Sequence, residues 1–346
     1  MLTTKKHEVK QSMIMRKHTE NERNHTIDVI KGICILFVII THYKWKDSNK
    51  QMLLFPFWID MAIPVFMIIT GYVNTLSFDQ KKVNTLNNAY NPSNIFKKFL
   101  RYTIPFVPVY IFEVSLYIIT QKKHYSIITL VIDFIEGGYG PGSYYYPVLI
   151  QIIFFLPLVW YIIKKYKEKG LLLIFIINML YEIFKNIIGI NDTLYRLLAL
   201  RYLFNLSLGC YLSCLKQVRK QHIIAAFIGL FYLFIFNYTG INPFIMTKWT
   251  NTSMISVLFV FTVVKWIIDK NKLKNIVLES LGKASYNIFF AQMLYYKFFS
   301  KIVYKHLHGS LMQIAINIFI CCSAGLLFYF IEKPITKWIV RKVVKE

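Results

Sequence analysis

Two apolar runs near the start of the chain carry ionisable side chains where a lipid bilayer disfavours them. They read NHTIDVIKGICILFVIITH and LLFPFWIDMAIPVFMIITGYVNT and lie within residues 24–75. Each run is long enough to cross the apolar part of a bilayer, which takes about 20 residues. A charged group inside such a span costs about 2.5–3.5 kcal/mol or more, so it usually faces the interior of a helix bundle and marks a working site. The first candidates for chemistry are Asp28, Lys31, His42 and Asp60.

The spacing places three of these groups on one face of the first helix. At about 100° per residue, His42 falls within about 20° of Lys31 and about 40° of Asp28, and it lies about 16 Å further along the axis than Lys31. If the second run returns antiparallel, Asp60 reaches a depth similar to that of His42. A carboxylate that orients an imidazole is what a buried general base needs. The alternative is an interfacial histidine beside an Asp28–Lys31 pair that only neutralises itself.

The composition indicates a membrane protein. The chain is 56% hydrophobic and 17% aromatic, its mean hydropathy is +0.45, and apolar runs recur to the end. The net charge of +24 does not indicate nucleic-acid binding, because the basic residues stand in short clusters between apolar runs. The five cysteines show no metal-ligand spacing and no position suited to disulfides, so we expect no metal site.

These patterns predict an all-α polytopic membrane protein with about ten transmembrane helices. The predicted spans are approximately 25–43, 53–76, 98–120, 144–163, 171–190, 197–215, 222–239, 251–268, 284–304 and 311–331. A cytoplasmic N-terminus places most basic residues on the cytoplasmic side, so both termini are predicted to be cytoplasmic. The predicted divisions are a basic N-terminal tail (1–24), a transmembrane domain (25–331) and a basic C-terminal tail (332–346).

The first two runs resemble the start of the acyltransferase-3 family of bacterial integral membrane O-acyltransferases. The pattern IDxIKGICILxVxxTH, followed by IDMxxPVFMxxTGY, carries the resemblance. Members typically open with a basic residue, ten intervening residues and a histidine in the first transmembrane helix, which here correspond to Lys31 and His42. The resemblance implies that 25–331 is an acyltransferase domain in the bacterial cytoplasmic membrane, surrounded by membrane lipids.

A basic cluster precedes the third span, in NPSNIFKKFLRYTIPF at 91–106. It is similar to a basic pair of the family, which Lys98 and Arg101 match best, with Lys97 beside them. Clustered cations at a membrane mouth suit the phosphates of coenzyme A, and arginine can hold a phosphate with two hydrogen bonds. From charge alone, a stop-transfer cluster explains these residues equally well.

A loop rich in glycine and tyrosine, EGGYGPGSYYYPVLIQ, occupies residues 136–151. Such glycine and proline content gives a shaped turn, and tyrosines at a membrane surface are expected as an interfacial belt. The alternative, similar in position to an aromatic-rich family motif, is a platform for a sugar ring made by Tyr144 and Tyr145, with Gln151 reaching in from the fourth span. Glu113, in the middle of the third span, is a further candidate for substrate contact.

Two later segments continue the resemblance. LGKASYNIFFAQMLYY at 281–296 looks like a motif that opens a late helix of the family, but Gln292 stands where many members carry histidine. We therefore expect Gln292 to contact substrate or support the site rather than to titrate. The last span ends FYFIEKPITKW, which resembles the closing motif of the family. Its Glu332 is placed to pair with Lys98 or Arg101, and a helix stop before Pro334 is the alternative.

The residues and the resemblance together predict a membrane O-acyltransferase. It would move an acyl group, acetyl in the first place, from cytoplasmic acetyl-CoA to a hydroxyl of a cell-surface glycan or its lipid-linked precursor. Lys31 would lie along the route of the donor. His42, oriented by Asp60 or Asp28, would act as general base or as transient acyl carrier.

Two alternatives come from other classes of protein. A non-enzymatic carrier would export a glycan or small anion through the same polar cavity, and carriers often show an internal repeat, which this chain lacks. A protein that only senses a ligand would tolerate loss of His42 as a base. Neither a metal nor a nucleic acid is expected as a partner.

Overall fold

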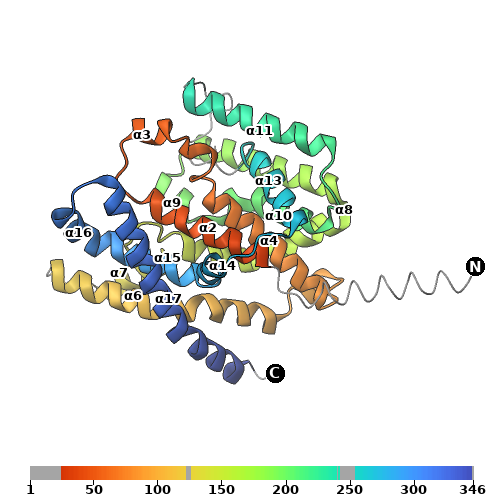
Figure 1. Ribbon diagram of the computed structural model, residues 1–346. Coiled ribbons are helices and arrows are strands. Elements are labelled where there is room, and N and C mark those ends of the chain that lie inside the picture. Colours follow the sequence, from red (N-terminus) through yellow and green to blue (C-terminus); the bar gives the residue numbers. More distant parts are fainter. Residues whose placement is uncertain (1–24, 122–125, 240, 242–253, 345–346) are drawn as a thin grey trace, which may run out of the picture.

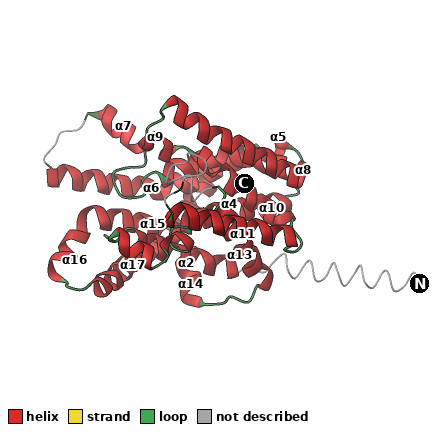
Figure 2. Ribbon diagram, turned by 90° about the horizontal axis from the view of Figure 1, so that it is seen from above, coloured by secondary structure: helices red, strands yellow, loops and turns green. Residues whose placement is uncertain are grey.

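The computed structural model describes residues 25–121, 126–239, 241 and 254–344, so the predicted N-terminal tail lies outside it. The described chain is helical and contains no strand (Figure 2). The elements are α2 (His25–Thr41), α3 (Asp47–Met52), η1 (Phe55–Phe57), α4 (Ala62–Gln80), α5 (Leu86–Ala89), α6 (Pro92–Gln121), α7 (Ile127–Ile135), α8 (Tyr145–Ile188), α9 (Asp192–Leu197), η2 (Ala199–Tyr202), α10 (Leu203–Cys214), α11 (Lys220–Tyr238), α13 (Val257–Lys270), α14 (Ile276–Lys283), α15 (Ser285–Leu294), η3 (Tyr295–Phe299), α16 (Ser300–His306) and α17 (Ser310–Val343).

Within the described residues, five helical segments are long and apolar enough to cross a bilayer. They are Phe55–Gln80, Leu86–Thr120, Tyr145–Lys185, Lys220–Tyr238 and Ser310–Val343. Other predicted spans coincide with shorter helices, since α2 has 17 residues, α10 has 12 and α13 has 14. The all-helical class is confirmed and the apolar helices mark a membrane protein. The count of about ten spans and the cytoplasmic termini stay predictions.

The longest element, α8, turns back on itself at Lys167, whose φ of 48° and ψ of −120° are not helical. Gln151 donates a hydrogen bond to the Leu197 carbonyl at 2.7 Å, and Glu182 accepts one from the Tyr195 hydroxyl at 2.8 Å. In a straight helix, Gln151 and Glu182 would be about 46 Å apart. Both can reach the segment around 195–197 only because the two halves of α8 run antiparallel. The reversal falls between the spans predicted at 144–163 and 171–190.

The central helices meet at glycines. Figure 1 shows α2, α4 and α14 in the middle of the molecule, with α6 and α17 on one side and α11 on the other. A Cβ atom on Gly71 of α4 would lie 2.2 Å from the Leu206 carbonyl oxygen of α10, and one on Gly282 of α14 would lie 1.8 Å from the Asp28 carbonyl oxygen of α2. Small residues allow this backbone approach between membrane helices. The contact with α14 fixes the helix that leads to His42.

A single helical stretch, interrupted in its middle, matches the span predicted at 284–304. It consists of α15, the five-residue π-helix η3 and α16, without a break in the chain. A π-turn widens the helix locally and rotates the side chains that follow it, and such turns are frequent at functional sites. Here the π-turn lies beside the end of α2.

Candidate functional site

A cavity of about 750 Å³ opens beside the end of α2. Four parts of the chain form its walls: the residues after α2, the loop between α7 and α8, α9, and the stretch from η3 to α16. We call it the outer cavity, because the predicted orientation places it on the external side. The side chains that dominate its lining are His42, Lys44, Tyr144, Arg196, Tyr296 and Lys297.

His42 is half-buried and directly follows the last residue of α2. Its ring centre lies 5.8 Å from that of Tyr296, and Arg196 lines the same cavity. Positive charge near an imidazole favours the neutral form of the ring, which is the form that accepts a proton. Among the described residues, His42 has no hydrogen bond to Asp28 or Asp60, each of which has other interactions. The orienting role of those carboxylates therefore stays a prediction.

The other ionisable groups of the first two runs lie away from the outer cavity. Asp28 is buried, 6% exposed, on the part of α2 that packs against α14. Lys31 is half-buried one turn further along α2. Asp60 is half-buried in the turn before α4, where its N–H donates to the Phe55 carbonyl at 3.1 Å. Of the four groups singled out in the sequence, His42 alone lines the outer cavity.

The two predicted platform tyrosines face different spaces. Tyr144 lines the outer cavity. Tyr145 is buried and lines an internal cavity of about 30 Å³ together with Ile35, Phe66 and Tyr286. Gln151 lines neither space, because its amide donates to the Leu197 carbonyl at 2.7 Å and accepts from the Ala199 N–H at 3.0 Å. It ties α8 to the segment that carries Arg196.

Tyr144 lies against two arginines. The guanidinium of Arg196 is 5.1 Å from the centre of its ring and that of Arg201 is 4.8 Å from it. Cations at these distances are attracted to an aromatic face. Arg201 is only 2% exposed, and within the described residues its Nε and Nη2 have no hydrogen-bond partner. Both arginines pack against the ring. Arg196 brings positive charge to the cavity wall itself, and Arg201 brings it from the buried layer.

Two buried polar side chains lie behind the loop that lines the outer cavity. Glu113 is fully buried, and its carboxylate lies within reach of the backbone N–H groups of Tyr139 and Gly140 in the loop. A Cβ atom on Gly138 would lie 2.2 Å from Oε2 of Glu113. Gln292 is also fully buried, and its amide nitrogen donates to the Pro141 carbonyl at 3.2 Å. Both residues support the loop from inside, and their contact with substrate stays a prediction.

The fit of this loop gives a testable expectation for Gly138. Its φ of +90° disfavours any other residue, and an alanine would also press on the Glu113 carboxylate. Gly189, at the end of α8, has a φ of +71°, but a Cβ atom added there would meet no described atom within 4 Å. Gly138→Ala should therefore lower Tm by at least about 3 °C more than Gly189→Ala, measured by thermal unfolding of the purified protein. Equal shifts in Tm for the two variants would mean that the loop can move away from the added methyl group at little cost.

The predicted basic cluster lies at the other end of α6. Lys98 donates a hydrogen bond to Oδ1 of Asn74 at 2.7 Å, and its ammonium lies 5.0 Å from the ring centre of Phe78. Lys97 is half-buried beside it, and Arg101 is exposed. Lys98 and Glu113 are separated by about 22 Å along α6. The cluster and the outer cavity are thus at opposite ends of the bundle.

Glu332 does not pair with this cluster in the described residues. Its carboxylate accepts hydrogen bonds from Nδ2 of Asn287 at 3.1 Å and from the hydroxyl of Thr336. The helix α17 also continues through Pro334 to Val343, so the predicted helix stop at that proline is absent. Glu332 instead joins α17 to α15.

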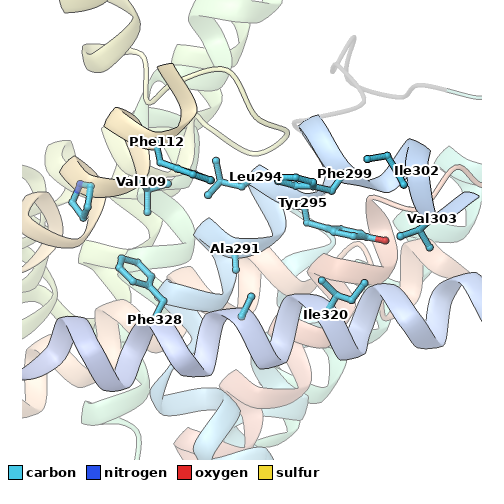
Figure 3. A pocket seen from close by; sticks show the side chains of 12 residues that line it. Val109, Phe112, Ala291, Leu294, Tyr295, Phe299, Ile302, Val303, Ile320 and Phe328 are labelled. Atoms are coloured by element: carbon cyan, nitrogen blue, oxygen red, sulfur yellow. The ribbon is translucent and has the colours of Figure 1, made fainter. Parts of the chain in front are cut away.

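An apolar groove of about 620 Å³ lies behind the outer cavity (Figure 3). It runs between α6, α17 and the helix that contains η3, and Phe112, Leu294 and Phe328 line it. Tyr295 points into this groove, whereas the next residue, Tyr296, lines the outer cavity. A single helix therefore separates the two spaces.

Several cavity residues escaped the sequence analysis: Lys44, Tyr296, Lys297, Lys301 and Tyr304. Lys297 and Lys301 are four residues apart at the predicted outer end of a span, where lysine runs against the charge bias of membrane proteins. This exception to the charge bias is the sequence feature that could have identified the two lysines as site residues. No group of three or more metal-binding side chains gathers anywhere in the described residues.

Almost the whole chain matches one protein family. A family model described as an acyltransferase domain matches residues 24–333. The match includes both His42 and the cluster around Lys98, and it covers nearly the whole chain. No curated protein and no solved structure matches the chain.

Proposed function

The chain belongs to the acyltransferase-3 family, and on this basis we propose that it is an O-acyltransferase of the bacterial cytoplasmic membrane. It takes an acyl group, acetyl in the first place, from acetyl-CoA on the cytoplasmic side. The acceptor is a hydroxyl of a cell-surface glycan or of its lipid-linked precursor. Overall, a C–O ester bond forms between the hydroxyl oxygen and the acyl carbonyl carbon, the C–S bond of the thioester breaks, and the hydroxyl proton ends on the sulfur of coenzyme A.

The observation that carries the proposal is the place of His42. It is the histidine of the family pattern, and it lines a polar cavity whose other walls are aromatic and basic. Such a cavity suits a hydroxylated acceptor, because tyrosine faces and hydrogen-bonding groups together recognise sugars. The loop over Glu113 and Gln292 gives this cavity a defined shape.

His42 has two alternative roles, and each needs a ring nitrogen that carries no proton. As a general base it removes the proton of the acceptor hydroxyl during attack and returns it to the sulfur of coenzyme A. As a transient carrier it first accepts the acyl group from the thioester, releases coenzyme A, and then passes the group to the hydroxyl. The cationic surroundings support both roles, since each begins with the neutral imidazole.

The basic cluster at the other end of α6 supports donor binding. Lys98, Lys97 and Arg101 lie where the phosphates of coenzyme A would be held, and Asn74 fixes the ammonium of Lys98. The small internal cavity beside Tyr145 and Ile35 lies between the helices that connect the two ends. In this proposal the pantetheine arm passes Lys31 and follows the interior of the bundle towards His42.

Replacing Lys98 by glutamine should raise the KM for acetyl-CoA by about 10-fold or more with little change in kcat. The reason is that a hydrogen bond between charged groups contributes to donor binding but not to the chemical step. Lys274→Gln is the matched control, since Lys274 is an exposed lysine in the loop before α14. An unchanged KM for acetyl-CoA in Lys98→Gln would mean that Lys98 does not contact the donor.

The proposal as a whole is tested by acyl transfer itself. Purified protein in lipid is incubated with acetyl-CoA and a crude envelope glycan fraction, and both released coenzyme A and ester-linked acetate on the glycan are measured. Acceptor-dependent release with matching ester formation supports the enzyme. Acetyl-CoA binding without turnover on any envelope fraction would favour a sensor. Absence of both binding and turnover would favour a carrier.

A further inference from the structure

The outer cavity has an unbalanced charge. Four permanently basic side chains line it: Lys44, Arg196, Lys297 and Lys301. They come from three separate parts of the chain, namely the turn after α2, α9 and the continuous helix formed by η3 and α16. Among the described residues, the only carboxylate in the lining is that of Glu136. The positive charge is therefore a property of the assembled cavity and not of one basic stretch of sequence.

Most of this charge has no ion-pair partner in the part of the protein that the structure describes. There, Lys44, Lys297 and Lys301 form no ion pair with a carboxylate. Lys297 lies 5.1 Å from the ring centre of Tyr117 and is attracted by the buried carboxylate of Glu113, whereas Lys44 and Lys301 lack even this partial compensation within the described residues. Lysines four residues apart on a helix repel each other, and basic residues on the external side oppose the charge bias of membrane proteins. This arrangement lowers stability unless a negatively charged ligand compensates it.

Aromatic faces and hydroxyl groups accompany these cations. Tyr139, Tyr144, Tyr296 and Tyr304 line the same cavity. Tyrosine presents a flat apolar face with a polar edge, which suits the faces and hydroxyl groups of a sugar ring. A volume of about 750 Å³ lies in the range of sites that enclose most of a small organic ligand. Cations beside tyrosines favour a charged saccharide over a simple inorganic anion.

We propose that the acceptor is an anionic saccharide, whose carboxylate or phosphate group is held by Lys297 and Lys301 while a nearby hydroxyl faces His42. This inference rests on the proposed acyl transfer and narrows its substrate class. The cations bind and orient the acceptor and take no part in bond making. Saccharides without an acidic group bind weakly, because they leave the lysines uncompensated.

The test measures binding directly. Wild-type protein in nanodiscs of phosphatidylcholine is titrated with a glucuronic-acid-containing tetrasaccharide and with the same tetrasaccharide after reduction of its carboxyl groups. A glycerol-phosphate oligomer is the phosphate probe. We expect at least one acidic probe to bind at least about 10-fold more tightly than the neutral tetrasaccharide, and the difference to shrink as salt rises. The acidic probe that binds more tightly shows whether the site recognises a carboxylate or a phosphate group.

The variant pair isolates the two lysines. Lys297→Gln/Lys301→Gln should weaken binding of the preferred acidic probe about 10-fold and leave the neutral tetrasaccharide unaffected. Lys305→Gln is the matched control, because Lys305 is exposed on α16 but does not line the outer cavity. Nanodiscs that contain phosphatidylglycerol test the remaining source of negative charge. If the anionic lipid displaces both acidic probes from the wild-type protein, the lysines bind headgroups and the inference fails.

Two further outcomes overturn the inference. One is equal binding of acidic and neutral tetrasaccharides, and the other is an equal loss of binding in the double variant and in Lys305→Gln. Because binding is measured without acetyl-CoA, its result is separate from acyl transfer. If the acidic probe binds in a lysine-dependent way but no coenzyme A is released, the anion site is supported and the proposed acyl transfer is wrong. If the rate of acyl transfer is the same for acidic and neutral acceptors and is unchanged in the double variant, the protein is an enzyme but has no anion site.

Discussion

His42→Ala should reduce acceptor-dependent coenzyme A release at least about 100-fold, which is the magnitude expected for removal of an acid–base group. The structure supports this expectation because His42 is the histidine that lines the outer cavity. Acetyl-CoA binding should change little, since the proposed phosphate contacts lie at the opposite end of α6. The measurement is steady-state coenzyme A release beside a separate binding titration.

His306→Ala is the control for this experiment. His306 is exposed near the end of α16 and lies outside the cavity lining. Its variant should keep wild-type turnover. If His42→Ala folds, binds acetyl-CoA and still turns over within a few-fold of wild type, another group is the base and the assignment is wrong.

The same preparation separates the two roles of His42. Wild-type protein is mixed with acetyl-CoA without acceptor, quenched rapidly and analysed by peptide mass. An acetyl group on the peptide that contains His42, absent from His42→Ala, identifies a transient carrier. Absence of that adduct, together with turnover when acceptor is present, identifies a general base.

Gly282→Ala should prevent accumulation of folded protein. A Cβ atom there would lie 1.8 Å from the Asp28 carbonyl oxygen and 2.7 Å from its carbon, both of which belong to the backbone of α2. No side chain can rotate away to make room, so the helices must separate along their whole contact. The expected loss exceeds about 4 kcal/mol, the range of the most disruptive substitutions. The measurement is the yield of monodisperse protein and its Tm.

Ser280→Ala provides the comparison on the same helix. Ser280 is half-buried, and its hydroxyl donates only to the Ile276 carbonyl one turn earlier at 2.7 Å. That variant should resemble wild type in yield and in Tm. If Gly282→Ala also matches wild type, α2 and α14 have room to move apart and the close contact between them is not maintained.

The sequence predicts the class of fold well, and it singles out one residue, His42, that lines the outer cavity. Long apolar stretches are sufficient to indicate membrane helices, and the eleven-residue interval from Lys31 singles out His42. The gap between the spans predicted at 144–163 and 171–190 contains Lys167, where α8 reverses. These features depend on local composition and spacing, which a sequence displays directly. The number of spans depends on where helices end and where they are interrupted, and the sequence pattern indicates these positions poorly.

The partners of each residue were harder to predict, because they depend on which helices become neighbours. Helical periodicity places Asp28 near the face of His42, yet α14, more than two hundred residues away in the chain, packs against that part of α2. Tyr144 and Tyr145 are adjacent in sequence but line different cavities. Lys297 and Lys301 line the outer cavity at and just after a π-turn, and no residue pattern in the sequence predicts such a turn.

The thinness of the wall that contains η3 has a practical consequence for work on the purified protein. Tyr295 faces the apolar groove and Tyr296 faces the space beside His42. A detergent tail or sterol that fills the groove thus lies one residue away from the ring that packs beside the histidine. The amphiphile chosen for extraction is in effect a ligand, and kinetic constants from different solubilised preparations are comparable only when it is held constant.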